Sequence, residues 1–111
     1  MTIHVLFSNY GSSTLIAGIT ASSTSVTLTS VTSFPTPSAP FYFYGTLVDQ
    51  ASVQAGLNPP NVREVVRVTA VSGNTFTITR GLDGTSPAIF NTGDYMQLKI
   101  NALALQDIIA G

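Results

Sequence analysis

Apolar and polar residues alternate along much of this chain, which predicts strands. Val26 and Leu28 share one face of their segment, and Phe76 and Ile78 share one face of another, with threonines between them. A period of two is typical of a strand with one buried face. We therefore expect an all-β fold, a small antiparallel β-barrel or sandwich of about 5–7 strands. The predicted strands are residues 24–29, 41–48, 64–71, 75–80 and 95–100.

Glycine, asparagine and aspartate separate these strands and predict the turns. The pair at 73–74 joins two β-branched strands into the hairpin 64–80, because both residue types tolerate positive φ. The expected turn residues are Gly73, Asn74, Gly81, Asp83, Gly84 and Gly93. Three prolines in 35–40 predict an extended connection, and residues 49–62 are expected to form a long loop.

The strand 41–48 begins with four consecutive aromatic residues. A strand places alternate side chains on opposite faces, so Phe41 and Phe43 are expected in the core, and Tyr42 and Tyr44 on the other side. There the tyrosines either meet a partner or are covered by the chain's own N-terminal segment.

The two ends of the chain carry apolar residues without a core of their own. Residues 1–23 are expected to form an arm lying on the β-domain 24–100 or on a neighbouring subunit, and residues 101–111 to form a short docked C-terminal helix. The candidate interface residues, besides the two tyrosines, are Val5, Leu6, Phe7, Leu15, Ile16, Leu105, Ile108 and Ile109.

Composition narrows the classes of protein that fit. Only 8% of the 111 residues are charged, against about 25% in a typical soluble domain, and 27 are Ser or Thr. Mean hydropathy of +0.35 excludes a disordered chain, and the low charge disfavours a free-standing monomer. Four cations give little attraction for nucleic acid, and no apolar run reaches the ~18 residues of a membrane span, so neither partner is expected. The N-terminus lacks the pattern of a signal peptide, and we expect a protein that is intracellular or is assembled inside a cell.

The residue inventory argues against catalysis. The chain has no cysteine, its one histidine is His4, and its five acidic residues are dispersed along the sequence. Neither a nucleophile with its base nor a converging set of metal ligands is indicated. We expect no enzyme activity, no cofactor and no metal.

The stretch from Arg80 to Thr85 is the most distinctive. Its glycines lack the spacing of a phosphate-binding loop, and no lysine follows. Glu64 and Arg80 lie at similar distances from the hairpin turn, so they are expected to lie near each other across the two strands. We therefore predict a structural Arg80–Glu64 ion pair, with the guanidinium also donating to loop carbonyls.

The pattern E-x-V-x-V from residue 64, continued by R-G-x-x-G-T at 80–85, resembles a small β-domain of tailed-bacteriophage virion proteins. The resemblance covers about residues 9–109. The loop 49–62 is longer than in the tightest versions of the pattern, which makes it a candidate contact element. It implies a virion location and a structural role beside adaptor, portal, fibre or coat proteins, and it carries over no catalytic residue. Homo-oligomers are the norm for such assemblies. The expected function is to join a fibre or appendage to the particle in the tail or head–tail region.

Two other functions remain open at this point. A capsid decoration (cement) protein would use the same arm and aromatic strand to clamp coat subunits. A module that binds host-surface glycans would rely on Tyr42 and Tyr44.

Overall fold

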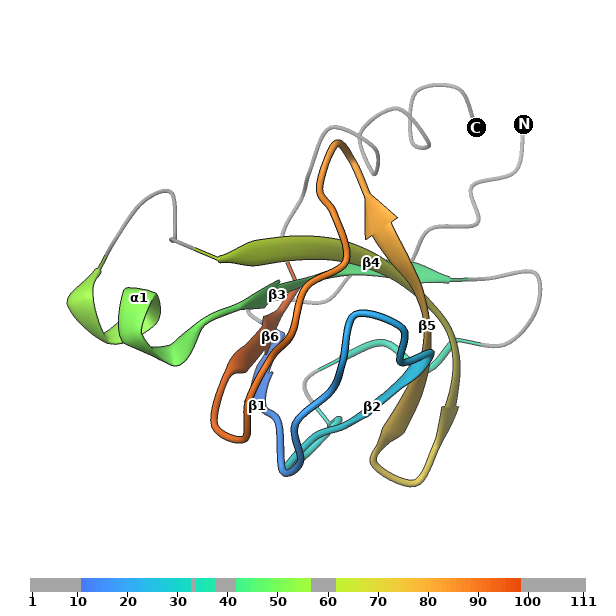
Figure 1. Cartoon of the computed structure of the whole chain (residues 1–111). Helices are drawn as coiled ribbons and strands as arrows, with labels where there is room; N and C mark the ends of the chain where they lie inside the picture. The colour runs from blue at the N-terminus through green and yellow to red at the C-terminus, as the bar shows by residue number, and fades with distance from the viewer. Residues whose placement is uncertain (1–10, 33, 38–41, 57–61, 99–111) are drawn as a thin grey trace.

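The computed structural model describes residues 11–32, 34–37, 42–56 and 62–98, and within them the chain is mostly β, with one short helix (Figure 1). One antiparallel sheet of six strands curves into an open half-barrel, in the order β1-β6-β3-β4-β5-β2. The strands are β1 (Ser12–Thr14), β2 (Ser25–Thr27), β3 (Phe43–Val48), β4 (Arg63–Ser72), β5 (Thr75–Leu82) and β6 (Tyr95–Gln97). The all-β expectation is confirmed. A sandwich is wrong, because the described strands form one sheet.

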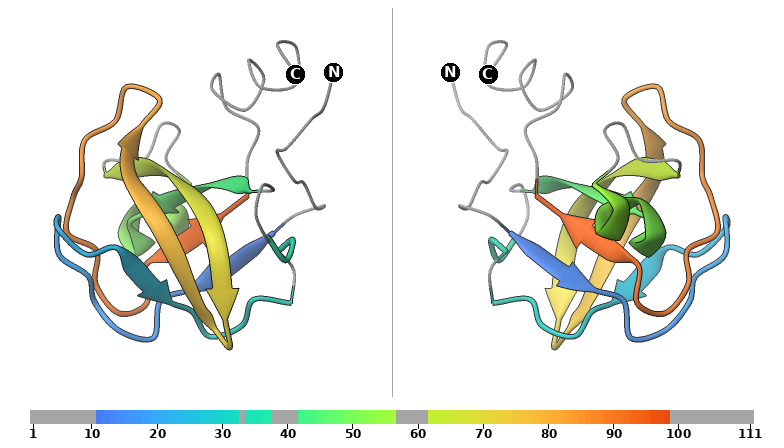
Figure 2. Two further views of the ribbon diagram at one scale, coloured as in Figure 1. Left: turned by 90° about the vertical axis from the view of Figure 1, so that its right-hand side faces the viewer. Right: turned by 90° about the vertical axis from the view of Figure 1, so that its left-hand side faces the viewer.

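The hairpin of β4 and β5 is the longest unit of the sheet. Its two-residue turn has Gly73 at φ +60°, whereas Asn74 stays at negative φ, so only the glycine supplies the left-handed conformation. Two register shifts interrupt the ladder, between Val65 and Arg67 and between Val68 and Ala70. Such bulges increase the twist of a hairpin, and Figure 2 shows both strands curving across one side of the molecule.

The two edge strands meet where the half-barrel approaches closure. Leu15 and Leu28 form an isolated bridge, the Thr29 N–H donates to the Thr14 carbonyl at 2.8 Å, and the Ile16 N–H donates to the Thr27 carbonyl at 3.1 Å. Side chains add to this seam, because the hydroxyls of Thr14 and Thr29 lie 2.9 Å apart. The backbone groups at these edges are thus satisfied within the chain, which protects the sheet from edge-to-edge pairing there.

The core lies on the concave side of the sheet and follows the predicted alternation. Phe43, Phe76 and Phe34 form a three-ring cluster, with centroids 5.4–5.8 Å apart. Val26, Leu28, Ile78 and Met96 are buried around them, as the alternation predicts. Phe34 comes from the proline-rich connection, so that segment also contributes to the core.

Residues 11–23, predicted as part of an arm, lie on the domain itself. Ser12–Thr14 pairs with β6, and Ile19 bridges to Phe90. Leu15 is 1% exposed within the main core cluster, so its assignment as an interface residue is wrong. Ile16, the next residue, is 54% exposed, in keeping with period-two alternation.

Residues 49–62 are not a plain loop, because they contain helix α1 (Gln50–Ala55), which follows directly on the end of β3 (Figure 1). Asp49 caps the start of α1, and Gly56 ends it in a left-handed conformation with φ +68°. These two residues are a sequence signal for a helix, but six residues with little apolar character give no helical periodicity. The helix predicted at 101–111 lies outside the described residues.

The two neighbours Leu15 and Ile16 offer a matched test of this arrangement. Leu15→Ala should lower the free energy of unfolding by about 2–5 kcal/mol, because it opens a cavity in the core. Ile16→Ala, at an exposed position, should change it by roughly 0.5 kcal/mol or less. Chemical denaturation of the full chain measures both values, and equal effects would contradict the placement of residues 11–23 in the domain.

Candidate functional site

A buried ion pair joins β4 and β5 at one end of the core. The Arg80 Nε donates to Glu64 Oε2 and the Arg80 Nη2 donates to Glu64 Oε1, both at 2.7 Å. This is a bidentate arrangement, the strongest geometry for a guanidinium and a carboxylate. The side chains are 0% exposed for Glu64 and 8% for Arg80. The pair predicted from the sequence is confirmed.

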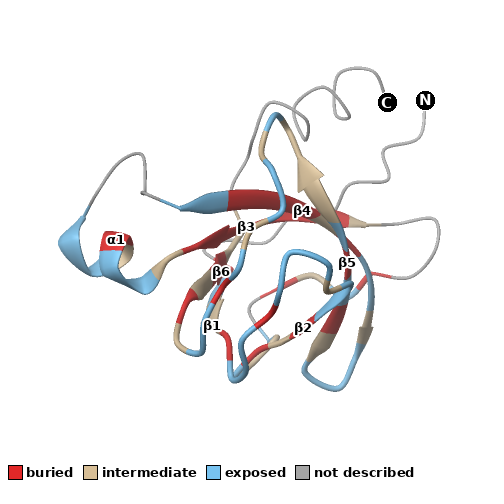
Figure 3. Ribbon diagram, in the orientation of Figure 1, coloured by how far each residue is buried: buried red, intermediate tan, exposed pale blue. Residues whose placement is uncertain are grey.

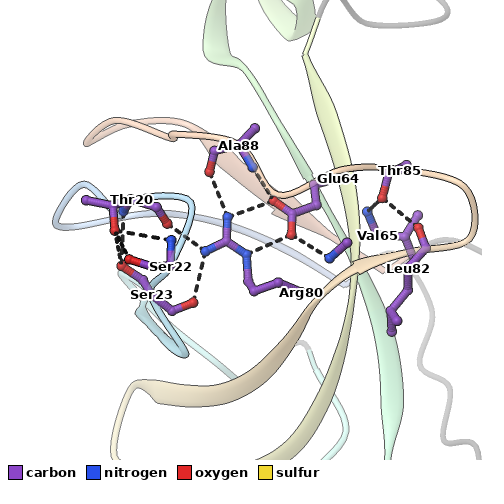
Figure 4. A network of polar contacts seen from close by, with 10 residues as sticks. Thr20, Ser22, Ser23, Glu64, Val65, Arg80, Leu82, Thr85 and Ala88 are labelled. Carbon is purple, nitrogen blue, oxygen red and sulfur yellow. Dashed lines mark hydrogen bonds and ion pairs between the residues drawn. The ribbon is translucent and has the colours of Figure 1, made fainter.

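The remaining donors of Arg80 bind backbone carbonyls, as Figure 4 shows. Nη1 donates to the carbonyls of Thr20 at 2.7 Å and Ser23 at 2.9 Å, and Nη2 donates to the Ala88 carbonyl at 2.7 Å. All five guanidinium N–H groups are therefore used. A lysine, with a point charge and three donors, could not replace this set.

The Glu64 carboxylate is satisfied in the same way. Besides the two bonds from Arg80, Oε2 accepts from the Gly81 N–H at 2.8 Å, and Oε1 accepts from the Ala88 N–H at 2.9 Å. Each oxygen thus accepts two hydrogen bonds, which matches the capacity of an ionised carboxylate. Burying two charges is costly unless they are paired and fully hydrogen-bonded, and this site meets both conditions.

Period-two alternation explains why these two charges point inward. Glu64 shares a face of β4 with Val66 and Val68, and Arg80 continues the face of Phe76 and Ile78 on β5. The two residues are not directly opposite, since Arg67 pairs with Thr79 and Val65 with Leu82. Arg80 therefore lies opposite Val66, which is the next residue after Glu64 on the inward face of β4. The bulge at this point of the ladder brings the side chains of Glu64 and Arg80 together.

The loop after Arg80 depends on its two glycines and its threonine. Gly81 and Gly84 have φ of +64° and +75°, and Asp83, at +51°, is also left-handed. The Thr85 hydroxyl donates to the Leu82 carbonyl at 2.6 Å and accepts from the Val65 N–H at 2.9 Å. Each fixed position of R-G-x-x-G-T thus has a structural role.

The outward face of β3 differs from the expectation for an interface. Tyr44 is 1% exposed, so its assignment as a partner-facing residue is wrong. It packs against Val65, with Tyr42 and Leu82 beside it, and accepts a hydrogen bond from Arg67 Nη2 at 3.0 Å. The Arg67 guanidinium lies 4.7 Å from the Tyr42 ring centroid, a cation–π geometry. This cluster is a contact that the sequence did not indicate.

Two carboxylates bind the start of α1, one from the turn before β6 and one from the residue that precedes the helix. Asp94 Oδ1 accepts from the Gln50 N–H at 2.9 Å, and its Oδ2 accepts from the Asn91 N–H at 2.8 Å. Asp49 Oδ2 accepts from the Ser52 N–H, and its Oδ1 from the Val62 N–H, both at 3.1 Å. Hydrogen bonding to the Ser52 side chain, followed by the backbone bonds, lowers the pKa of Asp49. Gly93 adopts φ +92° in this turn, as expected for a turn residue.

The carboxylates and the guanidinium described above all bind groups within the chain. In the ranges 11–32, 34–37, 42–56 and 62–98, no three His, Asp or Glu side chains are grouped to hold a metal ion. The same ranges contain no helix of the length and apolar character that crossing a bilayer requires. Of the other candidate interface residues, Ile16 is exposed, while Val5, Leu6, Phe7, Leu105, Ile108 and Ile109 lie outside the described residues.

Comparison with known proteins gives no assignment, since no protein-family model matches the chain and no curated protein matches it significantly. The structure alone defines the class of protein: an all-β domain with an open six-stranded half-barrel in its described part.

The hydrogen bonds around Arg80 predict a large loss of stability when this side chain is removed. Arg80→Ala should lower the free energy of unfolding by about 3–5 kcal/mol, because it leaves the Glu64 carboxylate buried without its partner. Arg80→Lys should recover only part of this loss. Thermal and chemical unfolding measure both, with Arg63→Ala, an exposed arginine on β4, as the control. An unchanged melting temperature for Arg80→Ala would contradict the prediction.

A double variant tests the backbone contacts separately. Replacing a simple buried ion pair by apolar residues is often neutral. Here Glu64→Leu with Arg80→Met should remain strongly destabilised, because five backbone groups of Thr20, Ser23, Gly81 and Ala88 lose their partners. If the double variant were as stable as the native chain, the five backbone groups would not need Glu64 and Arg80 as hydrogen-bond partners.

Two glycines of the same loop form a second matched pair. A Cβ on Gly81 would lie 2.7 Å from Pro87 Cδ, whereas a Cβ on Gly84 would meet nothing within 4 Å. Gly84→Ala should cost only the left-handed strain of about 1–2 kcal/mol. Gly81→Ala should cost more by roughly 1 kcal/mol or above, because the loop must also move away from the new methyl group. Equal losses in chemical denaturation would contradict the role of Pro87.

Proposed function

We propose that this protein is a non-enzymatic structural protein of a tailed-bacteriophage virion, located in the tail or head–tail region, where it joins a fibre or appendage to the particle. The observation that carries the assembly role is the outward face of β2, β5 and the turn end of β4, which presents hydroxyl groups and carries almost no charge.

The hydroxyl face is laid out by the strand register. Ser25 pairs with Thr77, and Thr77 pairs with Ala70 on the other side; Thr27 pairs with Thr75, and Thr75 with Ser72. Exposed residues alternate with buried ones along β5 (Figure 3). Thr77 is among the exposed ones, and no charged residue lies in these two rows. We define the hydroxyl face as Ser25, Thr27, Ser72, Thr75 and Thr77, with Ala70 beside Thr77. Short polar side chains with little rotamer entropy are inexpensive to order in an interface.

Several of the few charged side chains are buried and therefore do not contribute to the surface. Glu64, Arg80 and Asp94 are buried or nearly so, and all three are committed to hydrogen bonds within the chain. The described surface is thus poorer in charge than the composition alone indicates. A surface depleted in charge suits a protein whose copies are covered in an assembly, since charged residues are depleted at interface cores.

The assignment to a phage particle rests on the resemblance of residues 64–85 to the virion β-domain. In this chain the residues of that pattern are determinants of the fold: the charge pair, the left-handed glycines and the Thr85 hydroxyl. The resemblance therefore supports a shared architecture, and the use of these residues within the fold supports the proposed structural role.

Purified particles provide the test of this function. Quantitative mass spectrometry of virions from the phage that encodes this chain should detect it at a copy number in the tens, as expected for a tail component. A copy number in the hundreds would instead indicate capsid decoration. Absence from particles that carry all other structural proteins would overturn the proposal, and glycan binding by the isolated chain would favour a host-recognition module.

The hydroxyl face can be tested independently of the particle. Thr77→Lys adds one charge at an exposed position and should prevent self-association or incorporation while leaving the melting temperature within a few degrees of the native value. Gln54→Lys, exposed on α1, is the control for added charge. Light scattering of the full chain measures self-association, and a native chain that stays monomeric at high concentration would contradict homo-oligomerisation.

A further inference from the structure

β1 and β2 form the two arms of a loose hairpin. Leu15 and Leu28 are bridged in the antiparallel sense, and this register, continued along the chain, places Thr20 opposite Ser23. The Ser23 N–H donates to the Thr20 carbonyl at 3.2 Å, which closes a two-residue turn between them. The segment 11–20 is therefore linked to the rest of the sheet by this turn.

The residues at the centre of the turn, Ala21 and Ser22, fit a hairpin of this length poorly. Two-residue hairpins favour turn types with positive φ, which glycine or asparagine supplies, because those types match the twist of the flanking strands. Among the described residues other than glycine, only Asp83 has a positive φ, so neither Ala21 nor Ser22 does. A turn without positive φ splays the two strands that it joins.

The two arms are separated near this turn. Ile19 bridges to Phe90 instead of to a residue of β2. Arg80 Nη1 donates to the carbonyls at both ends of the turn, Thr20 at 2.7 Å and Ser23 at 2.9 Å (Figure 4). The closed turn therefore depends on a side chain of β5 as well as on its own backbone hydrogen bond.

The segment 11–20 binds the domain through contacts that a second copy of the chain would reproduce unchanged. Its β1 residues pair with β6, and Leu15 and Ile19 belong to the main core cluster, at 1% and 8% exposure. The residues that receive them all follow the turn in the sequence. The same segment of a second copy therefore fits this place without any new contact surface.

We propose that two copies of this chain exchange the segment 11–20, with Ala21 and Ser22 as the hinge. In the exchanged dimer the turn is open, and β1 of each copy pairs with β6 of the other. Arg80 of one copy then binds the partner's Thr20 carbonyl, while its contact with Ser23 stays within the chain. Each buried network is thus completed by both copies.

The antiparallel register makes this exchange self-complementary. With the hinge extended, Thr20 of one copy lies opposite Ser23 of the other, and a twofold axis passes through the hinge. Such a dimer closes on itself and forms no open filament. The closed and exchanged forms share their other contacts, so the hinge and the protein concentration decide between them. The exchange rests on the self-association proposed above and gives it a specific partner, a second copy of this chain.

Engineered disulfides across the seam distinguish the closed form from the exchanged one, because the chain has no cysteine of its own. The hydroxyl oxygens of Thr14 and Thr29 lie 2.9 Å apart, so Thr14→Cys with Thr29→Cys places two thiols within reach of each other. In the exchanged dimer these disulfides link two chains. A denaturing gel without reductant should then show a shift from monomer to covalent dimer.

The matched control is Thr27→Cys with Thr75→Cys. These hydroxyls lie 2.8 Å apart across β2 and β5, and both strands follow the hinge, so this disulfide stays within one chain in either form. A dimer in solution whose disulfides between positions 14 and 29 lie within single chains would overturn the exchange and leave the proposed self-association standing. A chain that is monomeric by light scattering and crosslinked within itself would contradict both.

Two hinge variants test the cause of the exchange at exposed positions, where the core is left unchanged. Ala21→Asn with Ser22→Gly supplies the positive φ of a two-residue hairpin turn and should shift the dimer toward monomer. Ala21→Val with Ser22→Val favours extended backbone and should keep the protein dimeric. Light scattering of the full chain measures both, and the same oligomeric state for the two variants would overturn the proposal.

Discussion

The described structure depends above all on one fully satisfied charge pair. Glu64 and Arg80 lie at the end of the core, and together they bind backbone groups of four other residues, from Thr20 to Ala88. A buried carboxylate or guanidinium without its partners would be unfavourable by several kcal/mol, so the N-terminal segment, the hairpin and the loop after it must all adopt their positions at once. The pair thereby favours one arrangement of segments that have few apolar residues of their own.

Internal hydrogen bonds also hold two smaller parts of the structure, the contact between β1 and β2 and the start of α1. Where β1 and β2 approach, threonine hydroxyls and backbone groups of each edge satisfy the other. At α1, two aspartates take the place of an apolar contact. A chain with so few charges uses several of them internally, where the lower dielectric makes each hydrogen bond stronger than it would be at the surface. The outward residues of β2 and the neighbouring part of β5 carry hydroxyl groups instead.

Much of the fold was predictable from the sequence, because local periodicity and the core face coincide. The hairpin, the inward Phe76 and Ile78, the turn glycines and the ion pair all follow from alternation and the distance from the turn. Leu15 and Tyr44 were not predictable in this way. Their segments are short or apolar on both faces, so alternation assigns a face but does not indicate what covers it. Helix α1 was missed because its caps, rather than its periodicity, define it.

The sequence by itself determined which residues point inward and which strands form a hairpin, since both are local consequences of a period of two and of glycine at positive φ. Only the tertiary structure decided that residues 11–23 complete the sheet, that the sheet stays an open half-barrel, and that Arg80 binds Thr20, Ser23 and Ala88. Those contacts join residues up to 60 positions apart. Their partners are backbone carbonyls, which every residue carries, so no side-chain pattern in the sequence could identify them.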